Sequence, residues 1–473
     1  MRFKWLLSFL PVLLAGFYST LTAQPKKPNI ILILADDLGV GDLGVYGQQK
    51  IKTPQLDRLA KDGLQFNRFY TGTSVCAPSR SSLMTGQHTG HTPIRGNKAT
   101  QPEGQWPLPE GTVTIAGLLK SAGYITGDFG KWGLGFVGTS GDPNRQGFDE
   151  FYGYNCQSLA HNYFPEHLWH NSSKVSLPNT TTQQTVYAAQ LIHEKAQQFI
   201  QKNSKQPFFL FLSYTLPHAA LQLPVNDSLL AHYIKVFDEK PVAVPTGWQG
   251  KGYQPQAYPH AAYAAMVGRL DQYVGEVRKQ VEALGIADNT LILFASDNGP
   301  HKEGGNDPVF FNSSAGLKGV KRDLYEGGVR TPFIAWWPGT IKAGRRSDFT
   351  GAFWDLLPTF ADLAGVKVSS LVDGISIVPE LRNQPQKKHD YLYWEFHEQG
   401  GKQAVRMGDW KGIRLNAIAR PDGPIELYDL RSDPAEQHNK AAAHPDITAR
   451  IADIMKKEHV ENEDFPFFQN TKK

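Results

Sequence analysis

The sequence predicts an α/β sandwich in which a large, mostly parallel sheet lies between helices, followed by a small C-terminal antiparallel sheet with a helix. Three observations support this prediction. Apolar runs alternate with helix patterns through the first three quarters of the chain. Polar residues repeatedly follow the carboxyl ends of those runs, which is where open α/β sheets bind ligands. After about residue 385 the pattern changes to short strands separated by glycine turns.

The elements of the larger part can be assigned in chain order. Apolar runs rich in β-branched and aromatic residues are typical of strands that are buried on both faces, and these runs are 29–35, 124–127, 207–214, 290–296 and 332–337. The helix patterns between them, several of which are closed by a glycine, cover 53–62, 114–121, 186–201 and 258–284. We therefore expect the ligand site just beyond residues 35, 214 and 296.

The smaller part follows with its own pattern. Short strands are predicted at 391–396, 403–407, 410–415 and 426–429, and a helix is predicted at 445–459. Gly400-Gly401 and Gly408-Asp409 are the turn signals between the first three strands. We expect residues 24–385 to form the main, catalytic domain and residues 386–473 to form a C-terminal subdomain.

Composition and charge exclude several classes of protein. The chain has 473 residues, of which 40% are hydrophobic and 11% are aromatic, as in globular proteins. The formal net charge is only +4, and no block rich in lysine and arginine indicates nucleic-acid binding. The two cysteines, Cys76 and Cys156, are too few for a disulfide scaffold.

The N-terminus predicts export. Arg2 and Lys4 precede an apolar run from Trp5 to Phe17, and small residues around Ala23 complete a signal peptide spanning 1–23. The alternative is an uncleaved anchor, but the run is short and contains Pro11. We therefore expect a secreted or periplasmic protein with no membrane span after removal of the signal.

Oxygen donors follow two of the predicted strands. Asp36 and Asp37 come directly after the first strand, and Asp297 and Asn298 follow the strand at 290–296. Carboxylate and amide oxygens suit Ca²⁺ or Mg²⁺ rather than zinc, which prefers nitrogen and sulfur ligands. An Asp-Asp pair alone would more often be a helix cap or a solvated turn, but two such pairs at equivalent places favour a metal site.

The stretch from Thr71 to Asn97 carries a specific motif. Residues 76–80 spell C-x-P-S-R and residues 83–86 spell L-x-T-G. This pattern resembles the signature of type I sulfatases of the alkaline phosphatase superfamily, including arylsulfatases and N-acetylgalactosamine sulfatases. The alternative is a buried structural cysteine at the start of a helix. In a helix, Arg80 would lie one turn from Cys76 and face the same pocket.

The resemblance implies a cofactor and a maturation step. In that family a maturation enzyme converts the signature cysteine, here Cys76, to formylglycine (3-oxoalanine). The hydrate of this aldehyde carries two hydroxyls on one carbon. One hydroxyl can attack sulfur, and the other can then collapse to the aldehyde and expel sulfate. The resemblance also implies that the modified Cys76 joins Asp36, Asp37, Asp297 and Asn298 around one Ca²⁺.

Further residues match the same family. Lys131 lies in a G-K-W run, Lys321 lies in KRDLYEGG, which resembles the family's K-x-x-x-Y-E-G-G, and His218 follows the strand at 207–214. The resemblance assigns Arg80, Lys131 and Lys321 to compensation of the sulfate charge, and His218 to contact with the sulfate or the leaving oxygen. Taken alone, each of these residues would more often be a solvated charge or a structural histidine.

The sequence departs from the family pattern at one position. Many members read G-K-W-H-L-G, whereas residues 130–135 read GKWGLG, so that Gly133 stands where the family has a histidine. Our hypothesis is that His301, which lies shortly after the predicted metal ligands, takes over part of that histidine's role. His88 and His91 are weaker alternatives that we expect to support the site from behind.

Two polar, glycine-interrupted loops, 87–97 and 394–403, are expected to form the rim of a substrate pocket. On that interpretation Arg95, Asn97, His397 and Glu398 contact the sugar, and the alternative is ordinary loop packing.

We therefore expect a calcium-dependent sulfatase that acts on sulfated carbohydrates of the galactose or N-acetylgalactosamine type, in an exo-acting pocket. Two alternatives remain open. One is a phosphodiesterase or phosphonate monoester hydrolase of the same superfamily. The other is a homologue that binds sulfated glycans without turning them over, which Gly133 makes conceivable.

Overall fold

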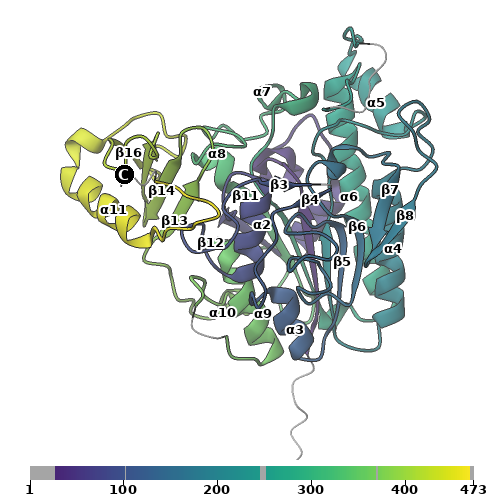
Figure 1. Ribbon diagram of the computed structural model, residues 1–473, viewed down its shortest axis with the longest axis horizontal. Coiled ribbons are helices and arrows are strands. Elements are labelled where there is room, and N and C mark those ends of the chain that lie inside the picture. Colours follow the sequence, from purple (N-terminus) through teal and green to yellow (C-terminus); the bar gives the residue numbers. More distant parts are fainter. Residues whose placement is uncertain (1–26, 102, 246–251, 369–370, 469–473) are drawn as a thin grey trace, which may run out of the picture.

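The computed structural model describes residues 27–101, 103–245, 252–368 and 371–468. The predicted signal peptide at 1–23 lies outside these ranges. The described chain forms a ten-stranded sheet flanked by helices and, beside it, a four-stranded sheet (Figure 1). This confirms the predicted fold class. Among the described residues, none of the helices combines the length and apolar character that crossing a bilayer requires.

The large sheet places its most apolar strands in the middle. Its strands, in spatial order, are β12 (Arg345–Ala352), β2 (Leu64–Tyr70), β11 (Arg330–Trp336), β10 (Thr290–Ser296), β1 (Asn29–Ala35), β9 (Phe208–Ser213), β5 (Ile125–Lys131), β6 (Glu150–Tyr154), β7 (His167–His170) and β8 (Ser173–Ser176). Strands β10, β1, β9, β5 and β6 run parallel to one another. β11 is antiparallel to both its neighbours, and β7 is antiparallel to β6 and β8. The carboxyl ends of the central parallel strands therefore share one edge.

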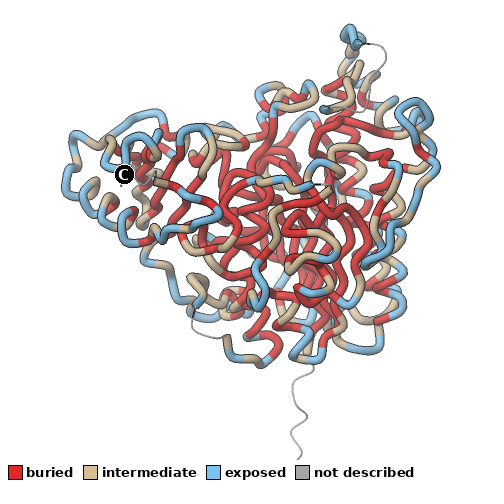
Figure 2. Tube along the Cα trace, in the orientation of Figure 1, coloured by how far each residue is buried: buried red, intermediate tan, exposed pale blue. Residues whose placement is uncertain are grey.

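Helices cover both faces of this sheet because the central strands are apolar on both sides. In β1, Ile31 and Ile33 belong to one core, whereas Leu32 and Leu34 belong to the other. The first core receives α1 (Pro54–Lys61), α4 (Ala188–Asn203), α5 (Ser228–Phe237) and α6 (Pro259–Ala283). The second core receives α2 (Cys76–Thr85), α3 (Ile115–Ser121), α9 (Leu356–Ala364) and α10 (Val378–Leu381). Figure 2 shows the resulting buried centre and an exposed periphery of loops. Two short helices, α7 (Pro308–Phe311) and α8 (Glu326–Val329), lie in the connection between β10 and β11.

The C-terminal elements form the predicted antiparallel sheet and helix. The strands are β13 (Leu392–Phe396), β14 (Lys402–Met407), β15 (Trp410–Leu415) and β16 (Ile425–Asp429), and the helix is α11 (Pro445–Glu458). The predicted boundary at 385 falls between α10 and β13.

Strand β13 is tied to the loop that precedes α2. The indole Nε1 of Trp394 donates to Thr71 O at 2.9 Å, and Thr73 Oγ1 donates to Glu395 O at 2.9 Å. Trp394 also packs in an apolar cluster with Val75 and Trp354. The small sheet therefore helps to shape the segment that leads into Cys76.

Several elements were not predicted from the sequence, notably β2, β6, β12 and α9. The predicted strand at 124–127 was also too short, because β5 continues to Lys131. Its second half contains Gly127, Asp128 and Gly130, which disfavour a strand locally. Pairing with β9 and β6 on both sides supplies the backbone hydrogen bonds, and Asp128 Oδ1 accepts a hydrogen bond from Ser213 Oγ at 2.8 Å.

Candidate active site

The candidate site lies at the shared carboxyl edge of the parallel strands. Asp36 and Asp37 directly follow β1, and Asp297 and Asn298 directly follow β10. Because Ala35 pairs with Ser296, the two pairs of polar residues are neighbours, and the Asp37 amide donates to Asp297 Oδ1 at 3.1 Å. All four residues are fully buried. The structure thus brings together the four oxygen donors predicted from two distant parts of the sequence.

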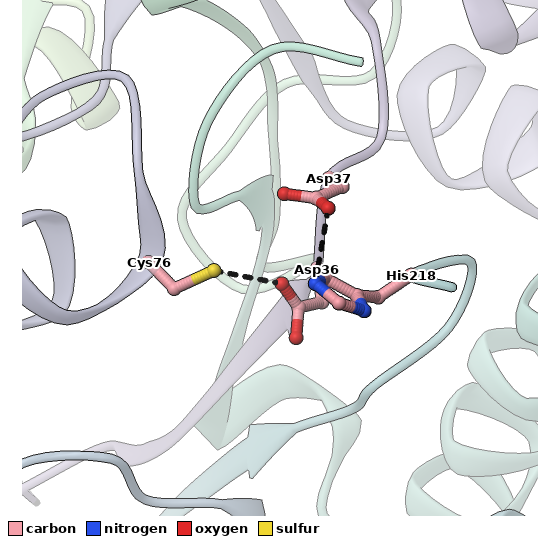
Figure 3. Close-up of side chains that lie close together, drawn as sticks. All are labelled: Asp36, Asp37, Cys76 and His218. Atoms are coloured by element: carbon pink, nitrogen blue, oxygen red, sulfur yellow. Dashed lines mark hydrogen bonds and ion pairs between the residues drawn. The ribbon is translucent and has the colours of Figure 1, made fainter. Parts of the chain in front are cut away.

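Cys76 is the first residue of α2 and faces this cluster. Its Sγ lies 3.4 Å from Asp36 Oδ1, and the residue is only 3% exposed (Figure 3). Burial, followed by the charge of Asp36, raises the pKa of the Cys76 thiol well above its usual range. The unmodified side chain therefore carries its proton at neutral pH.

Two buried cations lie behind Cys76. One helical turn along α2, Arg80 contacts Asp297 Oδ2 through Nε at 3.0 Å and through a terminal nitrogen at 2.9 Å. Lys131, the last residue of β5, places Nζ 2.6 Å from Asp36 Oδ2. Burial would lower the pKa of Lys131, but the negative charge of Asp36 outweighs burial and raises it. Both cations are therefore charged at neutral pH.

Lys321 and His218 lie around the other aspartate. Lys321 Nζ is 2.8 Å from Asp37 Oδ2 and 3.3 Å from His218 Nε2. His218 Nδ1 donates to Ala219 O, which leaves Nε2 as the acceptor for the Lys321 ammonium. Burial and the Lys321 charge lower the pKa of His218 well below its usual value. His218 is thus a neutral imidazole that is open to the cluster (Figure 3).

The donors fit a hard divalent cation. Asn298 Nδ2 donates to Asp37 Oδ1 at 2.6 Å, whereas Asn298 Oδ1 is buried and has no hydrogen-bond partner among the described residues. A buried carbonyl oxygen without a partner is costly unless something absent from the protein contacts it. Burial and the neighbouring Asp36 also raise the pKa of Asp297 to about 7, which shows how densely carboxylates are packed here. Oxygen donors arranged in this way suit Ca²⁺ or Mg²⁺.

His301 is close to the site, but both its ring nitrogens have partners. Its ring lies 5.9 Å from that of His218. His301 Nδ1 accepts from the Glu303 amide at 3.1 Å, and Nε2 donates to Pro217 O at 3.2 Å. The predicted catalytic role of His301 remains a prediction, and the structure shows that His301 also holds the loop that carries His218.

The predicted sugar-contacting residues fall into two groups. Asn97 is exposed, and its Oδ1 accepts from the Ala77 amide at 3.2 Å, next to Cys76. Glu398 lies 4.0 Å from Arg322 Nε, and Arg322 pairs in turn with Glu303 near Lys321. These residues border the cluster.

The other two predicted contacts are engaged with the C-terminal subdomain. Arg95 is 2% exposed, and its guanidinium donates to Val460 O and lies 3.8 Å from Glu395 Oε2, from which His397 Nε2 lies 3.2 Å. His88 and His91 lie beyond the far end of α2. There His88 Nε2 is 3.2 Å from Glu458 Oε2 and His91 Nδ1 is 2.9 Å from Asp373 Oδ1.

Sequence reasoning missed three groups beside the site. The ring of His161 stacks on that of His218, with centroids 5.1 Å apart and planes 7° apart. Glu303 lies 3.7 Å from Lys321 Nζ. Gln157 fills the space beside Gly133, where an added Cβ would lie 2.5 Å from Gln157 Nε2. Recognition of β6 would have indicated His161 and Gln157, because both follow the end of that strand at the same edge of the sheet.

Comparisons with known proteins agree with this geometry. The family model described as Sulfatase matches residues 28–366, and the one described as N-sulphoglucosamine sulphohydrolase, C-terminal, matches residues 319–463. Human N-acetylgalactosamine-6-sulfatase is 32% identical over 388 residues, which cover 76% of this chain and 67% of that protein. Human arylsulfatase A is 31% identical in an alignment 490 residues long, and this alignment covers 92% of this chain and 87% of the other. The crystal structure of Ps i-CgsB in complex with k-i-k-neocarrahexaose has a TM-score of 0.78 and 31% identity, and covers 94% of this chain and 96% of that one.

Proposed function

Because this chain belongs to the sulfatase family, whose members hydrolyse sulfate esters, we propose that it is an exported, calcium-dependent sulfatase of sulfated carbohydrates with formylglycine at position 76. The observation that carries the proposal is the position of Cys76. Cys76 is the first residue of α2 and lies beside Asp36, and the cations that a sulfate ester needs contact Asp36 and Asp297. This arrangement combines a nucleophile position, a metal position and charge compensation in one buried place.

Each residue of the cluster has a role in this proposal. Asp36, Asp37, Asp297 and Asn298, with the modified residue 76, would hold Ca²⁺, which supplies positive charge toward the sulfate oxygens when it is bound. Formylglycine supplies the attacking hydroxyl once it has formed. Arg80 fixes the start of α2 relative to Asp297, and its charge and that of Lys131 offset the charge of the transferred group.

Lys321 and His218 face the remaining side of the cluster. Lys321 donates to His218 Nε2 and so orients the imidazole. In the proposed reaction, Lys321 binds a sulfate oxygen, and His218 hydrogen-bonds the sulfate or the leaving oxygen through Nε2 once that nitrogen has gained a proton. His218 can pass a proton to the leaving oxygen only after its Nε2, which now accepts from Lys321, has gained one.

The substrate class rests on the relatives. One relative is named N-acetylgalactosamine-6-sulfatase, and one structural neighbour holds neocarrahexaose. These names support a sulfated carbohydrate of the galactose or N-acetylgalactosamine type. We propose that Asn97 and Glu398, which border the cluster, contact the sugar directly. Arg95 and His397 remain proposed contacts, and their bonds to neighbouring residues also shape that rim.

Two measurements on protein from its native cell test the proposed function. The mass of the Cys76 peptide should show an aldehyde or its hydrate. The same protein should release inorganic sulfate from galactose or N-acetylgalactosamine sulfates, and should hydrolyse an aryl sulfate faster than the matching aryl phosphonate. An unmodified thiol together with an absence of sulfate release would contradict the proposal. Preference for the phosphonate would instead indicate the phosphonate hydrolase alternative.

Replacing His301 by alanine should lower kcat on an aryl sulfate by about 10²-fold, the lower end of what a general base contributes. We expect this loss because the His301 ring lies 5.9 Å from that of His218, the residue proposed to contact the sulfate or the leaving oxygen. His170→Ala is the matched control, because His170 lies on β7 with half of its side chain exposed. Full turnover by the His301 variant would exclude His301 as the replacement for the family histidine.

A further inference from the structure

A cavity of about 340 Å³ lies against the loop that follows β6. Its lining includes Ser158, His161, Phe164, Glu166, His167 and Thr181. This volume is at the lower end of the range for small-molecule sites in proteins. Its position beside the catalytic cluster and the chemistry of its lining both indicate which part of a substrate it could bind.

The cavity adjoins the catalytic cluster through His161. The ring that lines the cavity is the same ring that stacks on His218, at a centroid distance of 5.1 Å. The Tyr253 ring lies 4.9 Å from His161 and 5.9 Å from His218, so that the three rings pack together. A group in contact with His161 in the cavity is therefore one residue away from His218.

The same loop also holds the His218 segment in place. Tyr163, which lies between two of the lining residues, is buried, and its hydroxyl contacts Thr215 O at 2.6 Å and His218 O at 3.0 Å. A group that binds against this loop therefore contacts the same segment that holds His218 in place through Tyr163.

The lining is polar but carries no side chain suited to a sulfate. Among its described members there is no lysine or arginine, and Glu166 is the one carboxylate. Burial above all, with the charges of Lys131 and Lys321, lowers the pKa of His161 to about 3, so that His161 is neutral. A sulfate or carboxylate placed here would meet the Glu166 carboxylate and, among the described lining residues, no lysine or arginine. The catalytic cluster, by contrast, holds Arg80, Lys131 and Lys321.

The remaining groups suit hydroxyls and a sugar ring. Ser158 and Thr181 are exposed hydroxyl residues, and the exposed Glu166 carboxylate has no hydrogen bond or ion pair with any described residue. Carboxylates accept hydrogen bonds from sugar hydroxyls. His161 and Phe164 supply the aromatic part of the lining, although Phe164 is buried and one face of His161 is covered by His218, so that the pocket combines aromatic residues with a few polar groups.

We propose that this cavity binds a neutral sugar residue adjacent to the sulfated one, so that the preferred substrate is an oligosaccharide whose neighbouring residue carries neither sulfate nor carboxylate. The proposal rests on the proposed function, because it presumes that the sulfated sugar lies at the Cys76 cluster. It goes further by assigning a second site and the charge of the sugar that occupies it.

Three probes test the proposal with the calcium-loaded, formylglycine-containing enzyme. They are a sulfated monosaccharide that the enzyme hydrolyses, the same unit linked to a neutral sugar, and the same unit linked to a sulfated sugar. We expect kcat/KM to be at least about tenfold higher for the neutral disaccharide than for the monosaccharide, mainly through KM, with no such gain for the sulfated disaccharide. Equal values for all three probes, or a preference for the sulfated neighbour, would overturn the proposal.

Variants locate the effect in the cavity. Thr181→Trp fills the cavity, and Glu166→Gln removes its carboxylate, so that both should reduce the disaccharide-to-monosaccharide ratio of kcat/KM toward one. Gln183→Trp is the matched control, because Gln183 is exposed on the same turn and does not line the cavity. A ratio in Thr181→Trp equal to that of the wild type would overturn the assignment. Failure of the proposed function is distinguishable, because no probe would then release sulfate although residue 76 is converted.

Discussion

Replacing Cys76 by alanine abolishes sulfate release, with an expected loss of about 10⁴-fold or more in kcat, as is typical when a nucleophile is removed. The reason is positional: residue 76 is the one oxidisable side chain at the junction of Asp36 and the cations Arg80 and Lys131. The measurement is sulfate release by the purified variant, with a thermal melt to establish that it is folded. Because the substitution removes a single buried sulfur atom, the variant should stay folded, with a melting temperature lowered by a small cavity and by the loss of one proposed calcium ligand.

Two companion variants sharpen this result. Cys76→Ser presents a single hydroxyl, so that a sulfated serine would form without a second hydroxyl to expel sulfate. We expect at most one equivalent of alcohol per enzyme, followed by arrest. Cys156→Ala should retain turnover, because the Cys156 thiol contacts Ser158 Oγ at 3.2 Å and is not part of the cluster. Multiple turnovers by Cys76→Ala would show that another group is the nucleophile.

Removing calcium, or one carboxylate that holds it, should have the second-largest effect. Chelation should lower both activity and melting temperature, because a ligand that binds only the folded state stabilises it, by about 2.7 kcal/mol at a concentration 100-fold above Kd. Asp37→Asn should lose about 10³-fold in kcat/KM, since Asp37 contacts Lys321 and Asn298 and loses its charge. Calcium should no longer raise the melting temperature of this variant.

The control for the metal prediction is Asp348→Asn. Asp348 lies on β12 with 74% of its side chain exposed, where its carboxylate accepts from Asn67 Nδ2 at 3.0 Å and lies 3.8 Å from Arg68, away from the cluster. This variant should retain the calcium-dependent rise in melting temperature. If chelation changed neither the melting temperature nor the activity of the wild-type protein, a calcium site among these carboxylates would be excluded.

The central part of the fold could be predicted because its signals are local. β1 and β10 are continuous apolar runs that end abruptly in acidic residues, and a parallel arrangement alone brings those ends together. The pairing of Arg80 with the cluster followed from helical spacing, and α2 provides that spacing. For these residues, the geometry of a single helix or of one sheet edge determines which side chains lie close together, so that their places in the sequence were enough to predict it.

The missed parts depend on tertiary contacts. β12 mixes polar and apolar residues because it is the edge strand of the sheet, and β2, which pairs with β12 and β11, carries the half-buried polar residues Asn67 and Arg68. β6 has the sequence EFYGY. Its glycine, Gly153, is required there because the backbone of Gly130 in β5 lies too close to leave room for a side chain. Without β6, the position of His161 could not be anticipated. Likewise, polar rim residues such as Arg95 look alike in sequence whether they face a ligand or a neighbouring carbonyl.

The attachment of β13 to the loop before α2 sets an order of events during synthesis. Thr71 and Thr73 obtain their partners from Trp394 and Glu395, which leave the ribosome about 320 residues after Cys76. At roughly 5–20 residues per second, that interval is about 16–64 s. In the finished fold Cys76 is 3% exposed and enclosed by α2 and the carboxylates. Any enzyme that modifies this cysteine therefore has a limited time before the fold encloses it. Slower release of the C-terminal strands would lengthen that time.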